Sequence, residues 1–343
     1  MSKKFRVLYL CVFVLLALTL SAHAQDASTL ELVQERGHII CISHSGYPGF
    51  GFLDEEGNFS GFDTDFCRAT AAAIFGDADA HEILPASSAD RFTFLATGEG
   101  DVIYRTTTWT LSRDTDNNAQ YAVIYFYDGQ GLMVPTSLGV STIEELDGAT
   151  ICTDPGTTSE LNIADAFAAR GLEYTPLPIE DDEEAWNTYL EGRCDVRTTD
   201  RSYLASYAST AFPNPDEHMV LDITISKEPL AHVVRNGDDE WLDIIQWVTF
   251  ALINAEEYGI TSENVDDFLD SEDPVVRRML GTEDDFGGKL GLPSDWVYQM
   301  IKQVGNYGEM FDRNLGAGSP LNLPRGPNAL WTDGGLIYAP PFR

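Results

Sequence analysis

YAVIYFYDGQGLMV, the sequence of Tyr121–Val134, contains two extended pieces joined by Asp128-Gly129-Gln130-Gly131. Soon afterwards Leu138–Thr153 begins an α/β series, and Ile223–Val234 is again extended. Two extended crossings that enclose an inner α/β unit predict an inserted lobe with a two-strand hinge. We place this hinge near Asp128–Gly131 and Ser226–Leu230.

Short β-rich runs alternate with amphipathic segments of helical length on both sides of the hinge. In the first series the expected strands are His38–Ser43, His81–Leu84 and Asp101–Arg105, and the expected helices are Phe62–Phe75 and Ala89–Thr97. In the second series the expected strands are Ala149–Thr153, Glu173–Leu177 and Asp195–Thr198, and the expected helices are Ser159–Arg170, Glu183–Glu191 and Ser202–Ser209. This order predicts the α/β class with mostly parallel sheets.

The remaining chain is expected to be mainly helical at first, with Trp241–Tyr258 as the clearest amphipathic helix. From about Gly281 the sequence is rich in Gly, Pro, Asn and aromatic residues. This composition predicts a C-terminal extension that wraps around the protein with little regular structure.

The composition argues against several classes of partner. The 343 residues include 21 Lys+Arg and 55 Asp+Glu, which gives a formal net charge of -34. No nucleic acid is expected, because a phosphate backbone requires patches of Lys and Arg, and an anionic membrane surface is disfavoured for the same reason. We expect a soluble monomer with a strongly hydrated, acidic surface.

Residues 1–24 have the pattern of a secretory signal peptide. The pattern consists of a basic start, an apolar run and a small-x-small cleavage site, namely Lys3, Lys4 and Arg6, then Val7–Leu20, then Ala22-His23-Ala24. An uncleaved anchor is the alternative, but a spanning helix needs about 20 apolar residues. We expect cleavage after Ala24 and a periplasmic location.

Four cysteines follow the leader, namely Cys41, Cys67, Cys152 and Cys194. An even number in an exported protein favours disulfides, and three pairings are possible. We prefer Cys41 with Cys67 and Cys152 with Cys194, because each pair falls within one apparent lobe; four buried free thiols are the alternative. A metal site is not expected, because no two of these cysteines have C-x-x-C spacing.

No enzyme motif is evident, but two segments at strand ends have features of an anion site. RTTTWTLSR, from Arg105 to Arg113, combines hydroxyls and a guanidinium that together suit a carboxylate. Its alternative is a Thr-rich helix cap followed by a surface Arg. DPGTTSE, from Asp154 to Glu160, also joins a strand to a helix, and its alternative is an ordinary capping box of Thr157 with Glu160.

A third segment has a carboxylate where the first has guanidinium groups. In TTDRS, residues 198–202, Asp200 ends a strand and can accept hydrogen bonds from an ammonium group; the alternative is a helix N-cap. Together, the three segments predict a cleft at the carboxyl ends of strands that holds both a carboxylate and an ammonium. A free α-amino acid has both groups.

Seven pieces of the sequence then point to one family. They are GFDTDFCRA (61–69), RFTFLATG (91–98), TTTWTLSRDT (106–115), YDGQG (127–131), GTTSELN (156–162), GRCD (192–195) and ISKEPL (225–230). Together they resemble the periplasmic polar-amino-acid-binding proteins of ABC importers, which are solute-binding proteins of family 3. The subgroup that it most resembles is described as general L-amino-acid-binding or glutamate/glutamine/aspartate/asparagine-binding, and the resemblance covers essentially all of the chain after the leader.

This resemblance implies a two-lobed periplasmic-binding-protein fold of type II that closes on its ligand and docks on a membrane permease. Lobe 1 is expected to comprise residues 25–129 and 229–343, including the C-terminal extension, and lobe 2 residues 130–228. The implied function is binding of Glu, Gln, Asp or Asn without turnover, and no cofactor is implied. A dehydratase acting on arogenate or prephenate and a ligand-presenting sensor are the alternatives.

The resemblance also implies roles for single residues. Arg113 is expected to hold the ligand α-carboxylate with Thr108 as its hydroxyl partner, and Thr158 to bind it from the second lobe through its backbone amide. Asp200 is expected to accept the α-ammonium, and Tyr47 to cover the ligand.

Four further residues complete the set that is expected to contact the ligand. His44 falls where binders of basic amino acids tend to have an acid, which argues against Lys or Arg as ligand. Arg105 is a candidate for an acidic or amide side chain of the ligand, with an ion pair behind the site as the alternative. Thr106 stands at a strand-end position where the subgroup often has Ser or Asn, and Thr157 lies beside Thr158.

Overall fold

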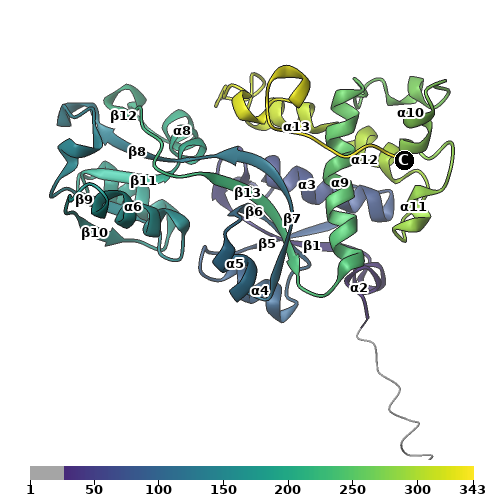
Figure 1. The fold of residues 1–343 in the computed structure, drawn as a ribbon, viewed down its shortest axis with the longest axis horizontal. Helices are drawn as coiled ribbons and strands as arrows, with labels where there is room; N and C mark the ends of the chain where they lie inside the picture. Colours follow the sequence, from purple (N-terminus) through teal and green to yellow (C-terminus); the bar gives the residue numbers. More distant parts are fainter. Residues whose placement is uncertain (1–26) are drawn as a thin grey trace, which may run out of the picture.

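The computed structural model describes residues 27–343, so the expected leader and its cleavage after Ala24 lie outside the described residues. Two α/β bodies, here called lobe 1 and lobe 2, each contain a five-stranded sheet, and extended segments run between them (Figure 1). The predicted two-lobed α/β architecture is therefore confirmed. Within 27–343, no helix combines the length and apolarity that crossing a membrane requires.

Lobe 1 contains the sheet with strand order β5-β1-β6-β13-β7. Its strands are β1 (Ile39–Ser43), β5 (His81–Pro85), β6 (Val102–Thr108), β7 (Ala119–Asp128) and β13 (Glu228–Arg235). β1 is parallel to β5 and β6, whereas β13 lies antiparallel between β6 and β7. The other elements are α2 (Thr29–Arg36), α3 (Phe62–Phe75), α4 (Arg91–Thr97), α5 (Leu111–Asp116) and the small sheet of β2 (Gly46–Tyr47), β3 (Gly51–Leu53) and β4 (Phe59–Ser60).

One boundary in lobe 1 differs from the expectation in a way that matters for the site. The strand that was expected to end at Arg105 continues to Thr108, because Thr107 and Thr108 pair with Ala231 and Leu230 of β13. Helix α5 then begins at Leu111, and the Thr110 side chain caps it by accepting from the Arg113 N–H. The segment from Arg105 to Arg113 therefore does lead from a strand into a short helix, but Thr110 caps this helix and the three consecutive threonines belong to the strand.

Lobe 2 contains the sheet with strand order β10-β9-β11-β8-β12. Its strands are β8 (Gln130–Pro135), β9 (Thr150–Thr153), β10 (Thr175–Pro178), β11 (Val196–Asp200) and β12 (His218–Val220). Its helices are α6 (Thr158–Ala168), α7 (Asp182–Leu190), α8 (Arg201–Thr210) and the 3-10 turns η1 (Thr136–Leu138), η2 (Ile143–Leu146) and η3 (Pro215–Glu217). β9 is parallel to β10 and β11, and β8 is antiparallel to β11 and β12.

The chain crosses between the lobes twice. Gly129 alone separates β7 from β8, and the return crossing leads into β13 at Glu228. A Cβ at Gly129 would lie 2.2 Å from the side chain of Thr224, so the two crossings approach too closely for any other residue. Both crossings fall where the two-strand hinge was predicted.

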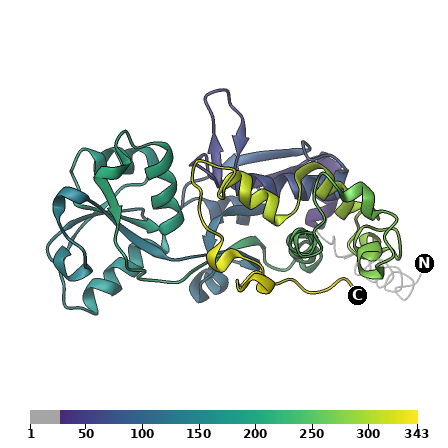
Figure 2. The ribbon, with the colours of Figure 1, turned by 90° about the horizontal axis from the view of Figure 1, so that it is seen from above.

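The C-terminal region packs against lobe 1 (Figure 2). Its helices are α9 (Asp239–Glu257), α10 (Pro274–Met279), α11 (Phe286–Lys289), α12 (Trp296–Val304) and α13 (Tyr307–Asn314), with 3-10 turns η4 (Val265–Phe268), η5 (Gly326–Asn328) and η6 (Trp331–Asp333). The expectation of little regular structure after Gly281 is wrong for residues 296–314. Trp296, Met300 and Val304 recur at helical spacing and are buried, and the capping box of Asn306 with Glu309 starts α13.

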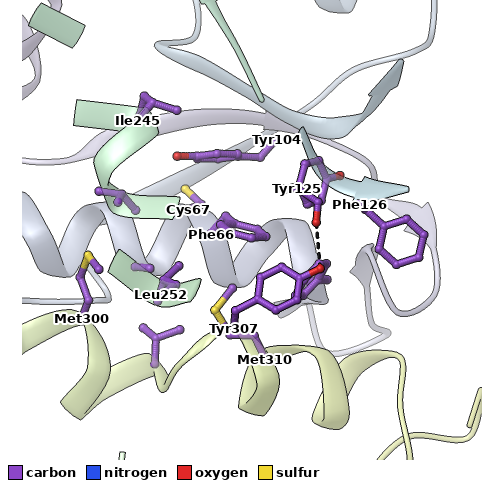
Figure 3. Packing of buried hydrophobic residues seen from close by; sticks show 14 of the residues in the cluster. Phe66, Cys67, Tyr104, Tyr125, Phe126, Ile245, Leu252, Met300, Tyr307 and Met310 are labelled. Atoms are coloured by element: carbon purple, nitrogen blue, oxygen red, sulfur yellow. Dashed lines mark hydrogen bonds between the residues drawn. The ribbon is translucent and has the colours of Figure 1, made fainter. Parts of the chain in front are cut away.

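The core of lobe 1 joins the sheet to these late helices. Phe66, Tyr104 and Tyr125 pack with Tyr307 and Met310 in the interior (Figure 3). The Tyr307 hydroxyl donates to the Tyr125 carbonyl at 2.9 Å, which ties α13 to β7. Because β7 leads directly into the hinge, the C-terminal region buttresses the strand from which lobe 2 extends.

Both preferred disulfides form, one in each lobe. Cys41 of β1 is bonded to Cys67 of α3, and Cys152 of β9 is bonded to Cys194, which precedes β11. The preferred pairing is thus confirmed, and the alternative of four free thiols is wrong. Each bond joins an inner strand of a sheet to another part of the same lobe, and neither bond crosses between the lobes.

Candidate functional site

The carboxyl ends of the central strands of both lobes meet at one small cavity between the lobes. The volume of this cavity is about 40 Å³. Nine residues that were expected to contact a ligand line it, namely His44, Tyr47, Arg105, Thr106, Thr108, Arg113, Thr157, Thr158 and Asp200. Parallel strands place their carboxyl ends at the same edge of a sheet, so residues far apart in sequence come together here.

Arg113 reaches across the cleft. Its Nη1 donates to the Thr108 carbonyl at 3.1 Å, and its Nη2 donates to the Gly156 carbonyl of lobe 2 at 3.4 Å. Burial lowers the pKa of Arg113, and the negative charges of Glu228 and Asp200 oppose this effect. An arginine remains protonated under such conditions, so Arg113 presents a cation at the boundary between the lobes.

Thr108 and Thr158 share an acceptor that the sequence did not indicate. Both hydroxyls donate to Oε2 of Glu228, at 2.5 Å and 2.9 Å. A hydroxyl has one proton, so in this arrangement both threonines present only lone pairs to the cavity. The expectation that Thr108 donates to a ligand carboxylate beside Arg113 therefore does not match this geometry.

Asp200 ends β11 and precedes α8. Although it occupies the N-cap position of α8, its side chain makes no capping hydrogen bond, so the alternative of a simple N-cap is wrong. Burial raises the pKa of Asp200 well above its usual range, and the charges of Asp128 and Glu228 add to the rise. A buried carboxylate with so little compensation would be stabilised by a cation in the cavity.

Thr157 has the structural role that was its alternative. Its hydroxyl accepts from the Glu160 N–H at 3.2 Å and donates to the Asp154 carbonyl at 2.6 Å. It therefore starts α6 as an N-cap, and the side chain of Glu160 accepts from the Gly156 N–H. Thr158 is the first residue of α6, where a backbone N–H has no partner within the helix.

Tyr47 covers the cavity from lobe 1. Its ring is 1% exposed and stacks on Tyr203 of lobe 2, with ring centroids 3.9 Å apart. The Tyr47 hydroxyl lies 2.6 Å from Oγ of Ser202, also of lobe 2. These contacts between opposite sides of the cleft describe a closed form of the protein.

His44 and Thr106 form a polar pair on the lobe 1 side. Nε2 of His44 lies 2.6 Å from Oγ1 of Thr106. Burial lowers the pKa of His44 well below its usual value, and the charges of Arg105 and Arg91 lower it further, so the ring is neutral. Thr106 has φ +30°, which is a strained value for a β-branched residue. Its backbone N–H donates to Asp63 at 3.3 Å, and this contact helps hold the strained turn in place.

Arg105 is 4% exposed and donates from Nε to the Ala86 carbonyl at 2.8 Å. None of the ion pairs found within residues 27–343 includes it, so its alternative role as part of an ion pair is wrong for the described chain. Arg105 also lines a second, larger cavity of about 690 Å³. His44, Ser88 and Asp182 line both cavities as well.

Sequence reasoning missed Arg91, which starts α4 and is 3% exposed. Its Nη1 donates to the Ser88 carbonyl at 2.6 Å, whereas its Nε is buried without a partner. Burial lowers its pKa well below the usual value, and the nearby charges of Arg113 and Arg105 lower it further. The available signal was its position just after strand β5, at the same sheet edge as the other candidates.

Asp182, in the acidic run DDEE of residues 181–184, was not identified from the sequence either. Asp181 does cap α7, accepting from the Glu184 N–H at 2.8 Å. Asp182 instead turns into the cleft, and burial raises its pKa to about 6, with the charge of Asp154 adding to the rise. Asp154 itself is paired with Arg197, whose Nη2 donates to both of its carboxylate oxygens, at 2.6 Å and 2.8 Å.

The cavity therefore has an excess of positive charge among groups that lack an ion-pair partner. Three arginines face it, namely Arg91, Arg105 and Arg113, against two carboxyl groups without an arginine partner, Asp182 and Asp200. This balance lies inside a protein of strongly negative net charge. The site is thus suited to a small ligand that has both signs of charge and a net negative charge.

A two-lobed α/β protein with a charged cleft between hinged lobes defines the class of periplasmic solute-binding proteins. The sequence profile of the bacterial extracellular solute-binding proteins, family 3, matches residues 39–264. The chain belongs to this family.

Individual relatives are similar over almost the whole chain. The general L-amino acid-binding periplasmic protein AapJ of Rhizobium johnstonii is 49% identical over 328 residues, which cover 95% of this chain and 96% of that protein. The glutamate/glutamine/aspartate/asparagine-binding protein BztA of Rhodobacter capsulatus is 49% identical over 325 residues, covering 94% and 96%. A cyclohexadienyl dehydratase of Pseudomonas aeruginosa is more distant, at 24% identity over 286 residues.

One solved structure matches the whole fold. It is an ABC transporter/periplasmic binding protein from Brucella ovis with glutathione bound, with a TM-score of 0.90 and 48% sequence identity. The match covers 93% of this chain and 100% of that chain, so it includes the C-terminal region as well as both lobes.

Proposed function

We propose that this protein binds a free polar L-amino acid in the cleft between its lobes and delivers it to the membrane permease of an ABC importer. The observation that carries the proposal is that Arg113 of lobe 1 and Asp200 of lobe 2 face one cavity. The α-carboxylate of a ligand can meet Arg113 while its α-ammonium meets Asp200 only when the two lobes are closed. The ligand therefore shifts the hinge equilibrium by its differential affinity for the closed form.

The amino-acid head group is held by groups of matching sign. The α-carboxylate accepts from the Arg113 guanidinium and from the Thr158 N–H at the start of α6. The α-ammonium donates to Asp200 and to the Thr108 hydroxyl oxygen, whose own proton is donated to Glu228. Tyr47 covers the head group and excludes water.

The side chain of the ligand extends toward Arg105 and Arg91. Two buried guanidinium groups favour a carboxylate or amide oxygen and disfavour the cationic ends of Lys and Arg. The neutral His44 beside them adds no negative charge that would favour a basic side chain. We therefore rank Glu and Asp first, then Gln and Asn; these four amino acids are the ones in the name of the Rhodobacter capsulatus relative.

A larger γ-glutamyl ligand such as glutathione is the second candidate. The observation that favours it is the cavity of about 690 Å³, which shares the lining residues Arg105 and His44 with the head-group cavity. In such a ligand the glutamyl head group would lie at Arg113 and Asp200, and the remaining residues would extend into the larger cavity. The bound glutathione of the Brucella ovis protein supports this possibility.

We propose binding without turnover by an exported, monomeric protein whose leader is removed after Ala24. The Rhizobium johnstonii relative and the Brucella ovis structure are both named as periplasmic proteins, which supports this location. A dehydratase would need a general acid in the cleft, and Asp182, with its pKa raised to about 6, is the residue that could serve. The binding function is preferred because the close relatives are named as binding proteins and the dehydratase is a distant one.

Thermal unfolding of residues 25–343, refolded free of co-purified ligand, tests the proposal. A ligand at 100 times its dissociation constant should stabilise the protein by about 2.7 kcal/mol. We expect a clear rise in Tm with Glu, Asp, Gln or Asn and none with Lys or Arg. A rise with glutathione alone would favour the second candidate. No rise with any of these compounds would refute amino-acid binding, and product formation from prephenate or arogenate, followed by absorbance, would then favour the dehydratase.

A further inference from the structure

We propose that Glu228 is a positioning residue that latches lobe 2 onto lobe 1 in the closed form, even before a ligand binds. The Glu228 latch consists of this carboxylate and its four hydrogen-bond donors, Thr108, Ser226, Thr158 and Asn162. The expected effect of Glu228 on ligand affinity rests on the proposed function. The expected effect of Glu228 on closure of the ligand-free protein does not depend on which ligand binds.

The latch lies where the chain returns to lobe 1. Glu228 is the first residue of β13 and pairs with Asp128, the last residue of β7, so its backbone belongs to the sheet of lobe 1. Its side chain is only 1% exposed. The carboxylate therefore lies directly at the two crossings that form the hinge.

The donors come from both sides of the cleft. Oε2 accepts from Thr108 of β6 at 2.5 Å and from Thr158 of α6 at 2.9 Å. Oε1 accepts from Asn162 of α6 at 2.8 Å and from Ser226 of the return crossing. Thr158 and Asn162 are four residues apart and so lie on the same face of α6. Opening the cleft would carry both away from Glu228.

Because two of the four donors belong to α6, the latch favours the closed form energetically. A buried carboxylate is costly unless hydrogen bonds compensate for its lost hydration, and bonds to an ionised group are stronger than neutral ones. In the closed form four donors satisfy it. In the open form the two donors of α6 are lost and only water can replace them, so the carboxylate favours the closed form.

The latch also sets the direction of the two hydroxyls that face the ligand cavity. Because Thr108 and Thr158 both donate to Oε2, their protons point away from the cavity and their lone pairs point into it. Glu228 itself does not line the cavity. It thus acts on the ligand through two other residues and through the hinge.

Glu228→Gln is the direct test, because an amide has nearly the same shape but its NH2 group cannot accept a hydrogen bond. Asn162→Ala is a second variant that removes one donor of lobe 2 and leaves the sheet of lobe 1 intact. Glu309→Gln is the matched control, because Glu309 accepts from Ser262 and Asn306 of the same lobe. If these three residues only stabilised the fold, each substitution should lower Tm without opening the cleft.

The first readout is the radius of gyration of the ligand-free proteins in small-angle X-ray scattering. We expect it to increase in Glu228→Gln and, by a smaller amount, in Asn162→Ala, and to stay at the wild-type value in Glu309→Gln. Equal radii for the wild type and both latch variants would overturn the proposal. If Glu228→Gln fails to fold, the comparison of Asn162→Ala with the wild type decides.

The second readout is the dissociation constant for the amino acid that most stabilises the wild type. We expect it to rise about tenfold in Glu228→Gln and to remain unchanged in Glu309→Gln, because a smaller closed population weakens the apparent affinity. An unchanged dissociation constant in Glu228→Gln would also contradict the latch. If no amino acid binds the wild type, the proposed function fails while the scattering comparison still decides on the latch.

Discussion

The hydroxyl oxygen of Tyr47 lies 2.6 Å from Oγ of Ser202, although the two residues belong to different lobes. Ser202 follows Asp200 by two residues and belongs to the first turn of α8. A side chain that covers the cavity from lobe 1 is thereby tied to the element that carries the acidic end of the site. Closure and ligand coverage are thus coupled through one hydrogen bond.

Tyr47→Phe should weaken ligand binding while it keeps the aromatic stack on Tyr203. A neutral hydrogen bond contributes about 1 kcal/mol, which corresponds to a roughly fivefold increase in the dissociation constant. Isothermal titration calorimetry measures this change. Tyr307→Phe is the control, because that hydroxyl bonds to Tyr125 within lobe 1 and should affect Tm alone. The same affinity loss in both variants would contradict a specific role for Tyr47.

Arg113→Ala should reduce affinity about 100-fold while the fold stays intact. Hydrogen bonds between charged groups contribute about 1.5–3 kcal/mol, and this variant removes the cation that meets the α-carboxylate. Arg170→Ala removes a surface arginine that pairs with Glu144 in lobe 2, and it should bind normally. Calorimetry and circular dichroism of both variants check the prediction. Wild-type affinity in Arg113→Ala would disprove the carboxylate assignment.

Arg105→Gln should change selectivity more than overall binding. The guanidinium faces the cavity without an ion-pair partner among residues 27–343, and we expect it to meet the side-chain carboxylate of a bound Glu. Losing a charged partner should weaken Glu binding about tenfold and Gln binding by less. Competition titrations with the two amino acids measure the ratio. An equal loss for both ligands would place Arg105 outside the side-chain contact.

Binding should weaken as pH falls, because Asp200 must be ionised to accept from the ligand ammonium. Burial raises the pKa of Asp200 in the empty site, so protonation begins at a higher pH than for an ordinary Asp. Affinity should therefore be full above this raised pKa and decline as pH drops through it, with proton uptake on ligand release.

Calorimetric titrations between pH 8 and pH 5 with two variants separate the contributing carboxyl groups. Asp200→Asn should bind weakly at every pH and lose most of the pH dependence. Asp182→Asn should retain the dependence that comes from Asp200, although burial also raises the pKa of Asp182, to about 6. A flat pH profile in the wild type would contradict the ammonium assignment for Asp200.

The sequence predicted much of the fold from local patterns, whereas the nine residues of the cavity lining came from motifs at strand ends together with the family resemblance. Alternating strands and helices predicted two α/β lobes, and Gly129 lies within the stretch that was expected to form the hinge. Arg113 and Asp200 could be found because they follow strands, and neighbouring parallel strands bring their carboxyl ends to one sheet edge. The disulfide pairing followed from the assignment of cysteines to lobes.

Other parts of the site were not predictable, because they depend on packing between distant elements. Glu228 accepts from Thr108, Thr158 and Asn162, which are 120, 70 and 66 positions away. Nothing in the local pattern indicated that this acid would be buried, or that its carboxylate would take the protons of two hydroxyls in the ligand cavity.

Arg91 and Asp182 illustrate the same limit. Each begins a short helix in a polar stretch, and each lines the cavity between the lobes. The sequence by itself determined the order of elements and the residues at their ends. The tertiary structure alone decided which charges are buried and which hydroxyls donate, because burial and hydrogen-bond partners arise only when the two lobes and the C-terminal region pack together.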